Sequence, residues 1–212
     1  MKPFYAFCRM VCRIIFLTYF RAQSFDSEKV PLEGRLILAG NHASFLDPPL
    51  IGCMIRRPTY YLARKSLFKF PIISRALLSM NAIPVDRDGR SGTGLKVALK
   101  AIEREQCLLL FPEGTRSLDG ARQPVKSGLG MMVVKTKCRV SPVRVGGTLE
   151  AYGRTLKFPR PKKVFVHYGD LLDFTDLIEE ARSADNQRQK EIYQEISDTI
   201  MDAIFELPAH GR

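Results

Sequence analysis

Short apolar segments recur along this chain from residue 21 onward, and they restrict its fold more than any other feature. Each is bounded by glycine, proline or charged residues, which is typical of strands buried in a sheet. In chain order, the predicted strands are residues 35–39, 59–63, 82–85, 107–111, 140–145 and 164–168.

Helical patterns occupy the segments between these strands. The predicted helices are residues 49–55, 72–78, 92–105 and 129–137, and an i, i+4 ladder predicts a further helix through Ile192, Ile196, Ile200 and Ile204. Alternation of strands and helices implies a sheet that is covered on both faces. We therefore predict an α/β fold: a single domain with a mixed, mostly parallel central sheet flanked by helices.

The N-terminal segment, residues 3–20, reads PFYAFCRMVCRIIFLTYF. Its longest uncharged stretch, residues 14–20, is far shorter than the roughly 20 apolar residues that cross a bilayer, and no small-residue cleavage site follows. On a helical wheel, Lys2, Arg9 and Arg13 share one narrow face, and aromatic and aliphatic side chains fill the rest. This pattern predicts an amphipathic helix in the headgroup region of an anionic leaflet. The alternative is a core helix whose arginines reach solvent.

The charge of the chain is strongly asymmetric. Its 33 lysines and arginines outnumber its 22 aspartates and glutamates, which gives a net charge of +11. Residues 1–169 hold 29 of the basic and 11 of the acidic side chains, whereas residues 170–212 hold 4 and 11. The basic part should attract phosphate-rich partners: nucleic acid, anionic membrane, phosphorylated small molecules or an acidic protein.

Three of the predicted strands end in polar clusters. NHASFLD follows the strand at 35–39, Asp86-Arg87 follows the strand at 82–85, and PEGTRS follows the apolar part of the strand at 107–111. In parallel sheets, ligands gather beyond the carboxyl ends of the strands. We therefore expect these clusters to converge on one site.

His42 and Asp47 lie five residues apart in the first cluster. His42 suits a general base, and Asp47 is the local carboxylate that can fix its tautomer. A turn over residues 43–46 would bring the two side chains together. The ordinary alternatives are a turn histidine and, for Asp47 before Pro48, the N-cap of a helix. Both roles are compatible if one Asp47 oxygen accepts from the imidazole and the other from a backbone N–H.

The segment FPEGTRS, residues 111–117, has the composition of an anion-binding turn. Gly114 allows close backbone approach, and Arg116 offers a planar fork that matches phosphate. Thr115 and Ser117 add hydroxyl groups beside it. The turn is therefore a candidate substrate-binding site.

The remaining charged candidates are weaker. We expect Glu113 to orient Arg87 or Arg116, or to accept a hydrogen bond from a substrate hydroxyl. Arg87 and Lys126 are further candidates for binding the same anion.

Other chemistries lack a matching motif. His167 alternates with valines along a predicted strand, and His210 lies in the tail. There is no G-x-S-x-G elbow, P-loop or dinucleotide fingerprint, and no nucleic-acid-binding module, so we expect no nucleic-acid partner. We also expect no metal or organic cofactor. The five cysteines are odd in number, form no C-x-x-C pair and are predicted to be buried, reduced thiols in a cytosolic protein: Cys8, Cys12, Cys53, Cys107 and Cys138.

Together these clusters resemble the motifs of the 1-acylglycerol-3-phosphate acyltransferase (lysophosphatidic acid acyltransferase) family and its glycerolipid acyltransferase relatives. The family's N-H-x-S-x-x-D motif stands at residues 41–47, and its F-P-E-G-T-R-S motif is matched in full at residues 111–117. An arginine after a strand matches at AIPVDR with Arg87, and a fourth block resembles VSPVRV at residues 140–145. The matches follow the family's order over residues 35–145.

The resemblance implies a glycerol-3-phosphate acyltransferase-like fold and an O-acyltransferase of phospholipid biosynthesis. It implies that Asp47 holds His42, and that His42 takes the proton from the free sn-2 hydroxyl of 1-acylglycerol-3-phosphate. The hydroxyl then attacks the acyl thioester directly and gives phosphatidic acid. Arg87 and Arg116 would clamp the phosphate and so position the hydroxyl.

The resemblance also implies partners and a location. The donor is expected to be acyl-CoA or an acyl carrier protein, and the acceptor lysophosphatidic acid at an anionic membrane surface. We predict a membrane-interface helix over residues 1–22, an acyltransferase domain over residues 23–212, and peripheral, monotopic association with the cytoplasmic face. The basic side chains expected to meet anionic lipid or carrier protein are Arg56, Arg57, Arg64, Lys65, Lys69, Lys157, Arg160, Lys162 and Lys163.

Two alternatives stay open. The first keeps the chemistry but acts on another lysolipid or on glycerol-3-phosphate. The second is a non-catalytic membrane module that only recognises phosphate-bearing lipid. The paired His42 and Asp47 argue against the second alternative, because binding alone needs no base.

Overall fold

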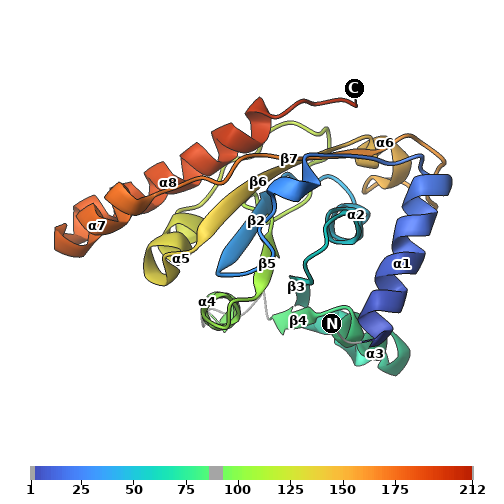
Figure 1. Cartoon of the computed structure of the whole chain (residues 1–212), viewed down its shortest axis with the longest axis horizontal. Coiled ribbons are helices and arrows are strands. Elements are labelled where there is room, and N and C mark those ends of the chain that lie inside the picture. The colour runs from blue at the N-terminus through green and yellow to red at the C-terminus, as the bar shows by residue number, and fades with distance from the viewer. Residues whose placement is uncertain (1–2, 86–92, 212) are drawn as a thin grey trace.

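The computed structural model describes residues 3–85 and 93–211, which form one sheet of seven strands with helices on both faces (Figure 1). The strands are β1 (Gln23–Phe25), β2 (Leu36–Gly40), β3 (Thr59–Arg64), β4 (Ala82–Val85), β5 (Cys107–Leu110), β6 (Arg139–Gly146) and β7 (Phe165–Tyr168). The α-helices are α1 (Pro3–Thr18), α2 (Asp47–Met54), α3 (Pro71–Ser79), α4 (Thr93–Glu103), α5 (Gly128–Thr136), α6 (Thr148–Tyr152), α7 (Thr175–Ser183) and α8 (Asn186–Glu206). Two short 3₁₀ helices are η1 (Ser27–Lys29) and η2 (Lys65–Lys69).

The strands lie in the order β1-β7-β6-β2-β5-β3-β4. Every neighbouring pair is parallel except β6 and β7, so the predicted mixed, mostly parallel sheet is confirmed. All six predicted strands are present, within one residue at each end. The parallel register pairs Ala39 with Leu110 and Pro142, so β2, β5 and β6 end side by side.

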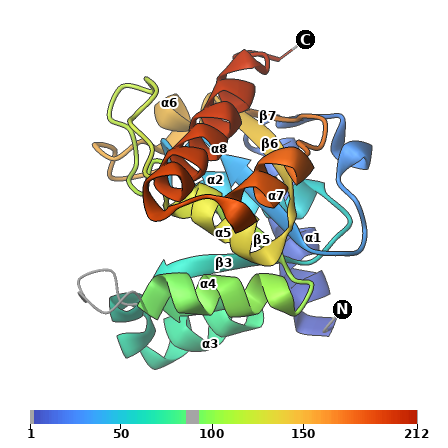
Figure 2. The same cartoon turned by 90° about the vertical axis from the view of Figure 1, so that its left-hand side faces the viewer.

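The central strand β2 is buried on both faces, and its side chains divide the core in two. Leu36 and Leu38 pack with α1 and α2, whereas Ile37 and Ala39 pack with α4, α5 and α8. Figure 2 shows α4, α5, α7 and α8 in front of one face of the sheet, with α1 behind it. The predicted isoleucine ladder of α8 is fully buried against this face.

The N-terminal helix α1 packs on α2 through its buried side chains. Phe16 joins the core, and the Tyr5 hydroxyl accepts a hydrogen bond from the Thr59 backbone N–H at 3.0 Å. Arg9 donates to the Arg56 carbonyl at 2.7 Å, so one member of the predicted basic stripe is directed at the body of the protein. None of the described helices is long and apolar enough to span a bilayer.

Two expectations about single side chains are corrected. Arg57 is buried rather than at the surface, and its guanidinium donates to the carbonyls of Pro31, Gly34 and Glu105. Among the cysteines, Cys53, Cys107 and Cys138 are buried as predicted, but Cys8 and Cys12 on α1 are only partly buried. Burial raises the pKa of the Cys53 and Cys107 thiols to about 12.

Candidate active site

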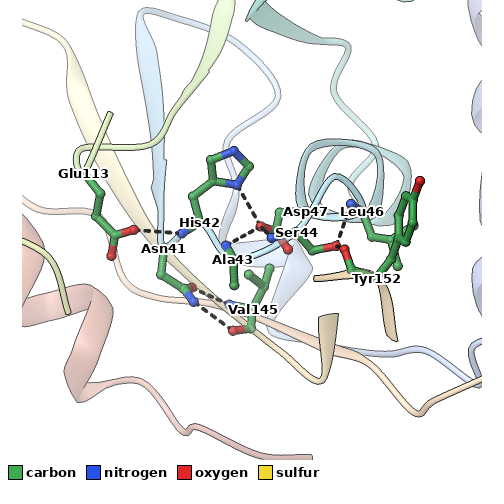
Figure 3. Close-up of polar contacts among 9 residues, drawn as sticks. All are labelled: Asn41, His42, Ala43, Ser44, Leu46, Asp47, Glu113, Val145 and Tyr152. Atoms are coloured by element: carbon green, nitrogen blue, oxygen red, sulfur yellow. Dashed lines mark hydrogen bonds and ion pairs between the residues drawn. The ribbon is translucent and has the colours of Figure 1, made fainter. Parts of the chain in front are cut away.

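The loop between β2 and α2 carries the first motif, and Asn41 fixes where it begins. The Asn41 side-chain amide donates to the Val145 carbonyl at 3.0 Å and accepts from the Val145 N–H at 2.8 Å (Figure 3). This pair of bonds ties the residue that follows β2 to the backbone of β6. His42 therefore emerges from a fixed point at the carboxyl edge of the sheet.

Asp47 organises the loop through one carboxylate oxygen. Its Oδ2 lies 2.8 Å from His42 Nδ1 and accepts the backbone N–H groups of Ala43 and Ser44, each at 2.7 Å. The side chain is fully buried, and three donors compensate for the burial of its charge. Oδ1 is also buried and has no hydrogen-bond partner among the described residues.

This geometry corrects the expectation for Asp47. Helix α2 begins at Asp47 itself, and no side chain caps it. The carboxylate accepts from residues that precede the helix rather than from the helix N-terminus. The imidazole and the backbone N–H groups share the same oxygen instead of taking one oxygen each.

The His42 ring is held so that one nitrogen remains available for chemistry. Nδ1 faces Asp47, and Figure 3 shows the other ring nitrogen pointing away from the loop. The ring stacks on Phe111, with centroids 4.0 Å apart and planes at 16°. In the neutral tautomer whose Nδ1–H donates to the carboxylate, Nε2 has a free lone pair and can act as a base.

The turn after β5 holds the His42 backbone from the other side. The Ser117 N–H donates to the His42 carbonyl at 2.8 Å, and the His42 N–H donates to Glu113 Oε2 at 3.3 Å. Glu113 therefore supports the loop that carries His42. Of its three expected roles, the pairing with Arg116 is not among the ion pairs of the described residues, and Arg87 lies outside them.

Burial raises the pKa of the Glu113 carboxyl to about 7. The backbone N–H groups of His42 and Gln123 and the positive charge of Arg144 oppose this rise, and the charge of Asp47 adds to it. Glu113 thus changes charge near neutral pH while it contacts the His42 backbone.

The other residues of FPEGTRS divide into two groups. Gly114 has φ of 68°, a conformation that favours glycine, and Thr115 lies next to Arg116 on the wall of a cavity. Ser117 is buried, and its hydroxyl donates to Asp119 and accepts from the Gly120 N–H, both at 2.9 Å. These contacts support a role for Ser117 in holding the turn.

A cavity of about 630 Å³ opens beside His42. One part of its wall is apolar and comes from α2, β3, α3 and β4, and the other part carries three guanidinium groups. The described residues that line it are His42, Phe45, Pro48, Pro49, Tyr61, Leu62, Ala63, Arg64, Ser66, Leu67, Leu77, Met80, Ala82, Thr115, Arg116 and Arg154.

Arg116 is the most confined of the three arginines. Its Cζ lies 3.6 Å from the centre of the Phe45 ring, and its Nη1 is buried with no hydrogen-bond partner among the described residues. Burial lowers the pKa of the guanidinium, the charges of Arg154 and Arg64 lower it further, and Asp47 raises it. The rest of the guanidinium lines the cavity, where it can bind an anion.

One predicted binding residue lies away from the described wall of this cavity. Lys126 is exposed, and it is absent from the described residues that line the cavity. Arg87 lies outside the described residues. Conversely, Arg64 was expected only as part of a basic surface, and nothing in the sequence marked Arg154 or Phe45 as part of the site.

No group of three or more histidine, cysteine, aspartate or glutamate side chains in the described structure could hold a metal ion. The described side chains of the site combine a base held by a buried carboxylate with arginines at the mouth of an apolar cavity.

Several known proteins resemble this chain. Residues 21–146 match the acyltransferase family. A 1-acyl-sn-glycerol-3-phosphate acyltransferase of Borreliella burgdorferi is 30% identical over 155 residues, which are 72% of this chain and 62% of the relative. The enzyme of that name from Cocos nucifera is 30% identical over 69% of this chain and 48% of its own length. The chain thus spans about half to three fifths of the length of these relatives.

Two further comparisons cover more of the other protein. A Bacillus subtilis 1-acyl-sn-glycerol-3-phosphate acyltransferase is 25% identical over 68% of this chain and 71% of its own length. The crystal structure of PlsC, the 1-acyl-sn-glycerophosphate (LPA) acyltransferase of Thermotoga maritima, superposes with a TM-score of 0.72 at 22% identity. The superposition covers 97% of this chain and 81% of the Thermotoga maritima chain, which shows a common fold. From the motifs, the fold and the family match over residues 21–146, the chain belongs to the acyltransferase family.

Proposed function

We propose that this protein transfers a fatty acyl group from a thioester donor to the free sn-2 hydroxyl of 1-acylglycerol-3-phosphate and so forms phosphatidic acid. The observation that carries the proposal is the 2.8 Å contact of His42 with the buried Asp47 in a cavity that also exposes Arg116. The names of the relatives support the same acceptor.

The proposed reaction needs no covalent enzyme intermediate. His42 Nε2 takes the hydroxyl proton while the oxygen attacks the thioester carbonyl, and Asp47 stabilises the imidazolium that forms. The tetrahedral intermediate then collapses, the carbon–sulfur bond breaks, and the imidazolium proton passes to the leaving thiolate. The products are the new ester and the free thiol, and His42 is restored.

Arg116 is proposed to hold the acceptor's phosphate. A guanidinium binds a phosphate oxygen pair in a planar, bidentate geometry, and stacking on Phe45 fixes its orientation. A held phosphate brings the nearby hydroxyl to His42, which turns an encounter into a positioned reaction. Gly114 and Thr115 shape the same turn, and Arg87 and Lys126 remain predicted contributors.

The donor is proposed to be acyl-CoA or an acyl carrier protein, and its acyl chain suits the apolar part of the cavity. The site is proposed to work at the cytoplasmic face of an anionic membrane. Helix α1 lies within the predicted interface segment 1–22, ahead of the domain of residues 23–212. It supports the membrane contact because it exposes large apolar side chains: Phe4, Phe7, Met10, Val11, Ile14, Ile15 and Leu17.

The test is thioester consumption by the purified protein. Release of free thiol from oleoyl-CoA, followed with a thiol reagent, should require 1-acylglycerol-3-phosphate, and phosphatidic acid should form in equal amount. Turnover with another lysolipid or with glycerol-3-phosphate, but not with 1-acylglycerol-3-phosphate, would move the proposal to that acceptor. Lipid binding without any thiol release would favour a non-catalytic binding module instead.

A further inference from the structure

The cavity beside His42 concentrates positive charge. Arg64, Arg116 and Arg154 line it together, and no aspartate or glutamate is among the described residues of its wall. The carboxylate that acts on Arg116 is the buried Asp47, which is already bound by three donors. Three guanidinium groups with so little compensating charge suit an anion that carries more than one negative charge.

Arg154 reaches this cavity because its loop is fastened to the catalytic loop. The Ser44 hydroxyl donates to the Tyr152 carbonyl at 2.6 Å and accepts from the Leu46 N–H at 3.1 Å. Ser44 also forms an isolated antiparallel bridge with Gly153. Arg154 is the next residue, so the loop that carries His42 also places Arg154.

Phe45 contacts both Arg116 and the segment that precedes Arg154. The Phe45 ring lies under the Arg116 guanidinium, and its centroid is 5.9 Å from that of Tyr152, two residues before Arg154. The charge of Arg154 lowers the pKa of Arg116 more than that of Arg64 does. Arg154 and Arg116 also line the same cavity, so one anion there can meet both guanidinium groups.

We propose that Arg154 is a third phosphate-binding residue, and that with Arg64 and Arg116 it selects an acceptor with a phosphate monoester over one with a phosphodiester headgroup. This rests on the proposed function and names a specificity determinant of the same site. A monoester has three free oxygens and a charge of about −1.5 to −2 at pH 7, so it can engage three arginines. A diester has two free oxygens and one charge.

The geometry of the acceptor agrees with this assignment. In 1-acylglycerol-3-phosphate only two carbons and one ester oxygen separate the sn-2 oxygen from phosphorus. A phosphate held among arginines of the cavity wall therefore leaves the hydroxyl within the same cavity as His42. Arg154 would thus act on binding, and not on the proton transfer.

The experiment compares two short-chain ligands that are monomeric in solution: 1-hexanoylglycerol-3-phosphate and 1-hexanoyl lysophosphatidylglycerol. Calorimetry measures their Kd for the full chain, for Arg154→Ala, for Arg154→Lys and for Arg160→Ala. Arg160 is an exposed arginine six residues further along, outside the described wall of the cavity, so its removal changes the net charge equally. Melting curves check that each variant is folded.

Arg154→Ala should weaken binding of the monoester roughly 3- to 10-fold, because Arg154 is exposed and its contact is partly screened. It should change binding of the diester much less, Arg154→Lys should retain part of the preference, and Arg160→Ala should match the wild type. Equal losses for both ligands, or no loss for either, would overturn the proposal.

The Kd values need no turnover, so this result is separate from the proposed reaction. A protein that binds the monoester through Arg154 but releases no thiol would refute the transferase activity and support the binding site. If the wild type releases thiol but Arg154→Ala leaves the Kd and the acceptor KM unchanged, the transferase activity is supported and the role of Arg154 is refuted.

Discussion

A single carboxylate oxygen organises the catalytic loop. Asp47 Oδ2 accepts from the His42 ring and from two successive backbone N–H groups, so the same atom sets both the imidazole and the turn that carries it. The five-residue spacing is explained by this geometry, because residues 43–46 must curl around the oxygen. At the scale of residues, the motif is thus a folded unit and not only a pair of reactive groups.

His42→Ala should reduce transfer roughly 10²- to 10⁴-fold, because no other described residue is placed as the base. Steady-state rates of thiol release measure this, and the Kd for 1-hexanoylglycerol-3-phosphate and the melting temperature serve as controls. Near-wild-type turnover in a folded His42→Ala protein would refute the mechanism. Asp47→Asn is a less selective variant, since it also weakens the two bonds to the loop backbone.

Arg116→Ala should raise the acceptor KM roughly 10- to 100-fold, because a charge-assisted bond to phosphate contributes about 1.5–3 kcal/mol. The donor KM should change little, and Arg116→Lys should recover part of the loss. Kinetics with each substrate varied in turn make the comparison. If the two KM values changed together and the melting temperature fell, Arg116 would have a structural role instead.

Glu113 should make stability depend on pH in an unusual direction. Its pKa is raised from 4.5 to about 7 by burial, so between these values the folded state binds more protons than the unfolded state. The free energy of unfolding should therefore fall as pH rises from about 4.5 to 7, by about 1–2 kcal/mol after solvent screening.

Denaturant unfolding at several pH values tests this prediction by comparing Glu113→Gln with the wild type. The wild type should lose more stability than the variant across this range of pH, since glutamine keeps an acceptor for the His42 N–H but does not titrate. Glu103→Gln, which removes an exposed carboxylate, is the matched control for the loss of one acidic side chain. Parallel curves for wild type and Glu113→Gln would contradict the raised pKa.

At the scale of elements, the sequence predicts those strands and helices whose residues form a strong local pattern. The six apolar strands and the long helices carry such patterns and are confirmed. β1 was not predicted because Gln23–Phe25 is short and largely polar, and it becomes a strand only by pairing with β7. The five-residue α6 and the strongly charged α7 were missed for the same reason: tertiary contacts decide their structure.

The residues of the site were likewise predicted where they lie in a local motif and missed where only tertiary contacts place them. His42, Asp47 and Arg116 lie in local motifs after predicted strands, so the sequence could place them at one edge of the sheet. Arg154 follows α6 with no motif of its own, and only the contacts of Ser44 with Tyr152 and Gly153 bring it to the cavity. That part of the site depends on long-range contacts, which no local pattern encodes.

Substitution of two glycines of α5 by alanine should have different effects on the free energy of unfolding. A Cβ on Gly130 would lie 2.0 Å from the Tyr193 carbonyl oxygen of α8, so Gly130→Ala must push the two helices apart. We expect a loss of roughly 1–3 kcal/mol in the free energy of unfolding. A Cβ on Gly128 meets nothing within 4 Å, so Gly128→Ala should be neutral or stabilise by up to about 1 kcal/mol. Denaturant unfolding measures both, and equal effects would contradict the close packing.

At the scale of the whole molecule, charge and apolar surface are segregated. α7 and α8 belong to the acidic segment 170–212, and they lie away from α1, on the other side of the sheet (Figure 1). α1 exposes its apolar side chains, and Phe70 and Ile72 at the start of α3 are also exposed. An anionic membrane that repels α7 and α8 and accepts α1 would orient the molecule without further contacts.

Charged substitutions on the outer face of α1 should test this orientation without disturbing the core. Phe7 and Ile14 lie seven residues apart on one face of α1 and are 57% and 52% exposed. The double variant Phe7→Asp/Ile14→Asp should weaken binding to anionic vesicles at least about tenfold, because each buried apolar side chain contributes roughly 1.5–3 kcal/mol.

Vesicle flotation measures this partitioning, and Leu32→Asp is the matched control. Leu32 is 63% exposed but precedes β2, at the opposite end of the strands from the catalytic loop, so its substitution should not affect flotation. Turnover of 1-hexanoylglycerol-3-phosphate, which needs no membrane, should stay near the wild-type rate in both variants. Full flotation of a folded Phe7→Asp/Ile14→Asp protein would exclude this face of α1 as the membrane contact. The basic side chains near residues 157–163 would then become the surface to test, since their attraction to anionic lipid, unlike apolar insertion, weakens as salt is added.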